Sequence, residues 1–263
     1  MATVTPELPA KEANLDKGQH RRDKRFEGRF VAAQEVENKR QPEALRKQLL
    51  TGAADLGLSV SPDKIDTLLD FVALLDRWNQ AYNLTAIRER ERMISHHLLD
   101  SLAIANDVQG PRVLDVGTGP GLPGIPLAIV LPELQFMLLD SNGKKTRFLV
   151  QAKSELGLDN VEVVQARVQD YRPQAPFDSV IARAFAALAD ILKWSRHLCR
   201  PGGRYLLMKG RLDPAEIETL PGGFTLLECR RLVVPGVEGE RHLLIVAPVS
   251  TTGTRSGTNL RYD

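Results

Sequence analysis

Cysteine is scarce in this 263-residue chain, in which Cys199 and Cys229 are the only two. Two cysteines so far apart exclude a disulfide framework and a cysteine metal cluster, so we expect two core thiols in a cytoplasmic protein. Long apolar runs are also missing. No stretch approaches the roughly 18 uninterrupted apolar residues that a membrane helix needs, and the N-terminus lacks the apolar centre of a signal peptide. The sequence therefore predicts a soluble, unexported protein with neither a membrane nor a metal partner.

A large excess of charge of one sign is missing too, because 35 basic and 33 acidic residues leave a net charge of +2. This balance excludes a polycation that coats nucleic acid indiscriminately. One local cluster, HRRDKRFEGR at residues 20–29, has two interpretations: a solvated tail or an arm that grips RNA. Both ends of the chain are polar and weakly periodic, so we expect a flexible charged extension over residues 1–40 and a flexible tail over 249–263.

Between these ends, the first periodic segments are helical. Residues 42–58 and 91–105 show helical spacing of apolar side chains, and Ser61 with Pro62 is a helix start signal, the serine as N-cap. These patterns predict a helical N-terminal subdomain over residues 41–108. His97 and Asp100 lie three apart on one helix face, where they could bond each other or contact substrate.

From residue 109 to 248 short apolar runs alternate with helical segments, and we expect one further domain there. Five strands are predicted at residues 113–116, 135–140, 161–166, 178–182 and 204–209, with helices at 122–131, 144–157 and 185–198. This order predicts an α/β fold, a doubly wound, mostly parallel sheet covered by helices on both faces. Two more strands, at residues 224–234 and 241–249, have no clear helix between them, so the last is expected to be antiparallel.

A glycine-rich loop follows the first predicted strand, in the sequence RVLDVGTGPGLPGIPLAIV at residues 112–130. Two ligand patterns overlap in it. The dinucleotide pattern G-x-G-x-x-G uses Gly119, Gly121 and Gly124. The methyltransferase pattern D-x-G-x-G-x-G uses Asp115, Gly117, Gly119 and Gly121.

Two carboxylates favour the second pattern. Asp115 would repel a pyrophosphate, but it would attract the ammonium and sulfonium of S-adenosylmethionine. Asp140 ends the second strand about 20 residues beyond the loop, where an acid can accept both hydroxyls of a ribose, as it does in NAD enzymes also. The third strand runs into Gln165, Ala166, Arg167 and Val168, where backbone groups could line an adenine or form an ordinary turn. An NAD-linked oxidoreductase stays as a lower-ranked alternative.

The residues around the fourth strand limit what could be methylated. Transfer to C5 of a pyrimidine needs a displayed cysteine nucleophile, and neither cysteine follows a proline. Transfer to an exocyclic amine is usually supported by an Asn/Asp-Pro-Pro-aromatic turn, whereas this strand ends in IARAF. A ring nitrogen with a free lone pair, such as guanine N7, needs only to be held in line with the methyl group.

Five segments together resemble the bacterial GidB/RsmG family: residues 77–104, 114–129, 138–149, 177–188 and 239–246. The resemblance covers about residues 43–248. It implies a class I (Rossmann-like) methyltransferase fold with an N-terminal helical addition. It also implies S-adenosylmethionine as cofactor and guanine N7 of the 16S RNA in the small ribosomal subunit as target.

The resemblance also implies site residues by matching position. The implied cofactor residues are Gly117, Leu122, Val168, Gln169 and Arg183; Gln169 departs from the acid common there, and Arg183 has a second interpretation as a structural ion-pair partner. The full predicted cofactor set is Asp115, Gly117, Gly119, Gly121, Leu122, Asp140, Ala166, Arg167, Val168, Gln169 and Arg183. The candidates for RNA contact are Arg88, Arg167, Lys209 and Arg241.

No obligatory catalytic side chain is predicted, and Arg183 and Arg241 are positioning candidates. We expect a monomer. The alternative hypothesis from another class is a non-catalytic RNA-binding or ribosome assembly factor with a vestigial cofactor fold.

Overall fold

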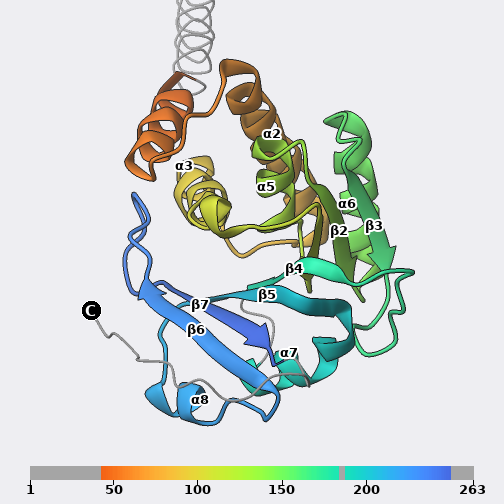
Figure 1. Ribbon diagram of the computed structural model, residues 1–263. Coiled ribbons are helices and arrows are strands. Elements are labelled where there is room, and N and C mark those ends of the chain that lie inside the picture. The colour runs from red at the N-terminus through yellow and green to blue at the C-terminus, as the bar shows by residue number, and fades with distance from the viewer. Residues whose placement is uncertain (1–42, 184–186, 250–263) are drawn as a thin grey trace, which may run out of the picture. The chain divides into compact units, whose positions relative to one another are not determined.

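Seven strands form one sheet in the computed structural model, which describes residues 43–183 and 187–249 (Figure 1). The strand order is β3-β2-β1-β4-β5-β7-β6. Strands β1 to β5 pair in parallel, and β7 is antiparallel to both β5 and β6. The strands are β1 (Arg112–Val116), β2 (Gln135–Asp140), β3 (Val161–Gln165), β4 (Phe177–Arg183), β5 (Cys199–Lys209), β6 (Phe224–Arg231) and β7 (His242–Pro248). The predicted doubly wound α/β sheet with an antiparallel last strand is confirmed.

The chain reverses direction across the sheet between β1 and β4. From β1 it moves outward to β2 and β3, and then returns to the other side of β1 as β4. A reversal of this kind leaves a crevice beyond the carboxyl ends of the central strands, which is where open α/β sheets bind ligands. The central strands β1 and β4 are buried on both faces, and their apolar residues are therefore consecutive in places, as at residues 113–114 and 180–182, instead of alternating with polar ones.

Helices cover both faces of the sheet (Figure 1). On one face, α2 (Pro62–Tyr82), α5 (Gly124–Val130) and α6 (Gly143–Glu155) share an apolar core with the helix at residues 43–55 and the side chains of Val113 and Leu138. On the other face, α7 (Leu188–Ser195), the 3-10 helix Arg196–Leu198 and α8 (Pro214–Glu218) cover a second core that includes Val180 and Tyr205. None of the described helices is both long and apolar enough to cross a membrane.

The segment before β1 differs from the single regular helix predicted at residues 91–105. It consists of α3 (Arg90–Met93), a π-helix (Ile94–Leu99), α4 (Asp100–Leu102) and a short 3-10 helix (Ala105–Asp107). A π-helix is rare and frequently occurs at functional sites. This one carries His96 and His97.

The predicted start of α2 is also only partly correct. Ser61 is the N-cap by its extended backbone and Pro62 is the first helical residue, but the Ser61 side chain makes no capping hydrogen bond. The nearby Ser61 hydroxyl instead stabilises the charged Asp63 carboxyl and so lowers its pKa.

Several boundary predictions stay untested. The extension at residues 1–40, with its basic cluster at 20–29, and the tail beyond residue 249 lie outside the described residues. The described residues from Leu45 to Val249 belong to one compact unit. The subdomain boundary near residue 108 stays a prediction.

The loop between β1 and α5 depends on glycine. Gly117, Gly119 and Gly121 have φ values of 65°, 62° and 88°, a region that glycine occupies without strain. Gly124 is needed for a different reason, because a Cβ there would overlap Leu138 and lie 2.7 Å from Asp115 Oδ2. The loop is therefore packed tightly against the end of the sheet.

We predict that Gly124→Ala lowers the free energy of unfolding by about 1–3 kcal/mol, because overpacking costs more than the better helix propensity of alanine regains. Gly222→Ala is the matched control, since a Cβ at Gly222 meets no atom within 4 Å. Urea unfolding of both variants tests this. Equal stability of the two would show that the sheet end yields to the extra methyl group.

Candidate cofactor and RNA site

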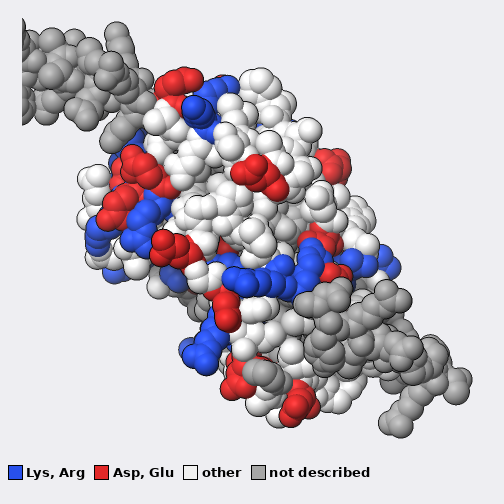
Figure 2. Space-filling model, turned by 90° about the vertical axis from the view of Figure 1, so that its left-hand side faces the viewer, with Lys and Arg blue, Asp and Glu red and all other residues white. Residues whose placement is uncertain are grey.

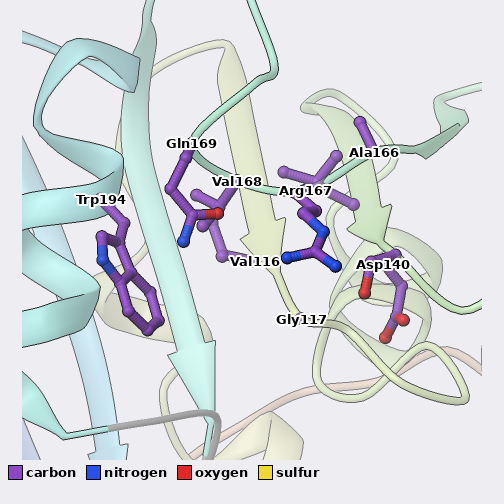
Figure 3. Close-up of a pocket in the computed structure, with 10 residues that line it drawn as sticks. Val116, Gly117, Asp140, Ala166, Arg167, Val168, Gln169 and Trp194 are labelled. Atoms are coloured by element: carbon purple, nitrogen blue, oxygen red, sulfur yellow. The ribbon is translucent and has the colours of Figure 1, made fainter.

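Two cavities lie at the carboxyl ends of the strands and share the backbone of Gly117. Their volumes are about 340 and 460 Å³, both in the range of small-molecule sites. The first cavity is lined by Val116, Gly117, Leu139, Asp140, Ser141, Ala166, Arg167, Val168, Gln169 and Trp194 (Figure 3). The second is lined by Ile87, His96, His97, Asp100, Gly117, Thr118, Gly119, Pro120, Leu122, Lys145, Arg183, Met208, Lys209, Gly210, Leu232, Arg241 and His242.

Asp140 organises the glycine loop beside the first cavity. Its Oδ2 accepts a hydrogen bond from the Gly119 N–H at 2.9 Å, and its Oδ1 accepts one from the Asn142 N–H at 2.8 Å. Each carboxylate oxygen can accept a second hydrogen bond, so Asp140 keeps acceptor capacity on a cavity wall. This placement suits the predicted partner of a ribose.

The turn after β3 forms a second wall of this cavity. The Ala166 N–H donates to the Asp140 carbonyl at 3.2 Å, which attaches the turn to the end of β2. The Val168 side chain is buried, whereas Arg167 makes no side-chain hydrogen bond or ion pair to any described residue. In the view of Figure 3 the Arg167 guanidinium lies between Gln169 and Asp140. Of the residues predicted around this turn, Ala166, Arg167, Val168 and Gln169 line the first cavity. Gln165 does not line it, and its Oε1 accepts a hydrogen bond from Thr146 Oγ1 at 3.3 Å.

Trp194 completes the first cavity from α7, opposite Asp140 (Figure 3). Sequence reasoning missed this residue, because an aromatic side chain in an apolar helical pattern is expected in the core. Only the order of strands and helices, which places α7 beside the end of β4, could have indicated it.

The second cavity contains one carboxylate shared by two arginines. Arg183 Nη1 donates to Asp100 Oδ2 at 2.9 Å, and Arg241 Nε donates to Asp100 Oδ1 at 3.1 Å. The Asp100 side chain is only 5% exposed, against 20% and 28% for Arg183 and Arg241. The second interpretation of Arg183, as a structural ion-pair partner, is therefore supported, because the Arg183–Asp100 ion pair is present in the wall of the second cavity. Asp100 does not bond His97, whose Nε2 lies 2.9 Å from Thr85 Oγ1.

Two lysines add positive charge to the second cavity. Lys209 Nζ pairs with Glu216 Oε2 at 2.7 Å, and Lys145 Nζ lies 3.9 Å from Asp140 Oδ2. Sequence reasoning missed Lys145. Of the four residues predicted to contact RNA, Lys209 and Arg241 line the second cavity and Arg167 lines the first. Arg88 lines neither cavity, and its Nη2 donates to Asn83 Oδ1 at 2.8 Å.

Basic side chains also gather on the molecular surface. Figure 2 shows them as a band across the middle of one face, with acidic side chains scattered around it. A local band of this kind can attract a polyanion although the net charge of the whole chain is only +2.

Two predicted cofactor residues line neither cavity. Gly121 lies inside the loop, where a Cβ would meet Ile125 Cδ1 at 2.5 Å. Asp115 has no exposed surface: its Oδ2 accepts hydrogen bonds from Thr118 Oγ1 at 2.6 Å and from the Gly124 N–H at 2.8 Å. The carboxylate expected to face the ammonium of a donor therefore faces the loop backbone.

Burial shifts the protonation of two groups near Arg183 in opposite directions. It raises the pKa of Asp115 to about 6, since its Oδ1 has no hydrogen-bond partner among the described residues. Burial, with a smaller effect of the Arg183 charge, lowers the pKa of His97 to about 4. His97 is therefore neutral near pH 7. No cluster of three metal-ligating side chains occurs in the described parts of the chain.

These two shifts predict opposing pH dependences of stability. Between about pH 4 and 6 the folded state holds the Asp115 proton that the unfolded state has lost, so this group makes stability fall as pH rises. Between about pH 4 and 6.5 the unfolded state holds the His97 proton, so this group makes stability rise. We predict that the two largely cancel, and that Asp115→Asn makes the unfolding free energy rise more steeply with pH, by up to about 1.4 kcal/mol per unit.

Urea unfolding at several pH values tests this, with His97→Gln as the counterpart that should show the opposite change. Identical pH profiles of the wild type and both variants would contradict the two shifts.

Comparison with known proteins identifies the family. Residues 64–244 match the family GidB, described as rRNA small subunit methyltransferase G. A protein of Pseudomonas syringae pv. syringae is 50% identical over 200 residues, which cover 76% of this chain and 94% of that protein. A protein of Ectopseudomonas mendocina is 52% identical over 202 residues (76% and 94%), and one of Escherichia fergusonii is 50% identical over 194 residues (74% and 94%). All three are named ribosomal RNA small subunit methyltransferase G. The chain therefore belongs to the GidB family of rRNA small subunit methyltransferases.

Proposed function

We propose that this protein transfers the methyl group of S-adenosylmethionine to N7 of a guanine in 16S ribosomal RNA. The observation that carries the proposal is the pair of cavities joined at Gly117, one suited to a nucleoside and the other basic. A donor that spans Gly117 would present its methyl group to a base held in the second cavity. Family membership supports the same reaction. In this proposal the protein acts as a monomer in the cytoplasm, on the small subunit or its RNA.

The residues of the first cavity fit the nucleoside end of S-adenosylmethionine. Asp140 has free acceptor capacity for ribose hydroxyls, and the turn at residues 166–169, with Trp194, would enclose the adenine. Gly117 and Gly119 allow the donor to approach the backbone closely, because they carry no side chain. Leu122 and Arg183 would flank the methionine end. When bound, the cofactor supplies an electrophilic methyl group on a positively charged sulfur.

The residues of the second cavity fit an RNA base and its phosphates. Arg183, Arg241 and Lys209 provide donors for the guanine O6 and for phosphate oxygens. Arg88 and Arg167 stay as candidates for RNA contact outside this cavity. The N7 lone pair is already free near neutral pH, so the transfer needs the reacting atoms to be in line and needs no general base.

A direct assay tests the proposed function. Undermethylated small ribosomal subunits incubated with the protein and labelled S-adenosylmethionine should acquire one N7-methylguanosine, which nucleoside mass spectrometry and mapping of the modified base would locate. Label on an exocyclic nitrogen, on protein or on no acceptor would overturn the proposal. Absence of transfer together with absence of donor binding would favour the non-catalytic assembly factor, and nicotinamide binding would favour an oxidoreductase.

We predict that Asp140→Ala raises the dissociation constant for S-adenosylmethionine by about tenfold to hundredfold, because hydrogen bonds to a charged acceptor and the order of the glycine loop are both lost. Calorimetric titration measures this constant. The exposed Asp159 lines neither cavity, so Asp159→Ala should bind the donor like the wild type. Equal affinity of the Asp140 variant and the wild type would remove Asp140 from the cofactor site.

A further inference from the structure

We propose that Asp100 is a positioning residue, which holds Arg183 and Arg241 together as a pair directed at the RNA base and limits the positive charge of the second cavity. The identity of that base rests on the proposed function. The pairing itself rests on the structure.

The pairing joins three parts of the chain that are far apart in sequence. Asp100 begins α4, Arg183 ends β4, and Arg241 immediately precedes β7. Each carboxylate oxygen takes one guanidinium, at 2.9 and 3.1 Å. Because Asp100 is buried and both arginines are partly exposed, the carboxylate fixes the inner side of each guanidinium and leaves the outer side toward the cavity.

Both arginines keep donors for a ligand. A guanidinium has five N–H donors. Arg183 uses only Nη1, on Asp100 and on the His96 carbonyl, and Arg241 uses Nε on Asp100 and Nη1 on the Glu240 carbonyl. The other nitrogens of both side chains bond no other described residue. They can reach the O6 of a guanine or a phosphate oxygen while Asp100 stays bound.

The charges explain why one carboxylate matters. The residues that line the second cavity include four cations, Lys145, Arg183, Lys209 and Arg241, and a single carboxylate, Asp100. The two lysines have other acidic neighbours, Asp140 and Glu216, so Asp100 is the counter-ion that the arginines share. Without it, two like charges in a partly buried wall would repel each other and separate. Removal of the carboxylate should therefore increase attraction for RNA while it disturbs the alignment of the base.

The chain offers a matched control. Asp107 pairs with Arg230 at 2.7 Å, and its side chain is 13% exposed, but neither residue lines the two cavities. Asp107→Asn removes a similar ion pair at another place in the same protein. Asp100→Glu keeps the charge of Asp100 and changes only its position.

The test compares these three variants with the wild type as full-length proteins. For Asp100→Asn we expect kcat on undermethylated small subunits to fall at least tenfold. Its affinity for a single-stranded oligoribonucleotide should be equal or higher, with a salt dependence steeper by about one phosphate contact. Asp100→Glu should restore the salt dependence of the wild type and leave kcat low. Asp107→Asn should change neither quantity.

Two results would overturn the inference: loss of RNA affinity in Asp100→Asn in parallel with kcat and melting temperature, or behaviour of Asp100→Asn like Asp107→Asn. Methylation by the wild type and by Asp107→Asn shows that the proposed function holds, so a defect confined to Asp100→Asn reports on Asp100 alone. If the wild type does not methylate the subunits, the proposed function fails, and the salt dependence on the oligoribonucleotide decides the role of Asp100.

Discussion

Both cavities depend on the glycine loop, which two carboxylates at the ends of neighbouring strands hold in place. Asp140 accepts the N–H of Gly119, and Asp115 accepts the N–H of Gly124 and the hydroxyl of Thr118. The N–H groups of a loop with left-handed glycines cannot all bond within a regular helix or sheet. Carboxylate oxygens at the strand ends accept these hydrogen bonds instead. Gly117, which lines both cavities, donates its N–H to the Leu139 carbonyl at 2.8 Å, so the end of β2 holds the loop at the point where the cavities meet. A site held in this way needs little rearrangement when a ligand binds.

Arg183 links this loop electrostatically to the second cavity. Its positive charge lowers the pKa of the buried Asp115, which limits the effect of burial on that carboxyl, and it also lowers the pKa of His97. One guanidinium thus favours a charged Asp115 and a neutral His97 on the two sides of the glycine loop. Asp100 in turn holds Arg183 in place. The glycine loop, the π-helix and the end of β4 are therefore parts of one electrostatic system.

The sequence alone predicted the features that depend on local pattern. The strands and the loop could be found because apolar runs and alternating glycines are local signals, and Asp140 because it directly follows a strand. The orientation of Asp115 could not be predicted, since β1 is buried on both faces and alternation gives no direction. The partners of Asp100 lie 83 and 141 residues away in the sequence, and contacts between such distant residues cannot be predicted from one sequence alone. Trp194 and Lys145 were missed for the same reason: only the folded chain brings them to the cavities.

In the proposed reaction the charges of the second cavity act at two stages. RNA enters as an anion, and the excess of cations around Arg183 and Arg241 favours its binding. Methyl transfer would then move the positive charge from the donor sulfur, which is left as a neutral thioether, to the guanine. No proton has to be removed, so a neutral His97 is compatible with the chemistry. A cavity of cations alone would oppose that new charge, whereas the shared Asp100 carboxylate offsets part of the repulsion. Once formed, the cationic base is held less tightly by the arginines than the neutral one, and this difference favours release of the methylated RNA.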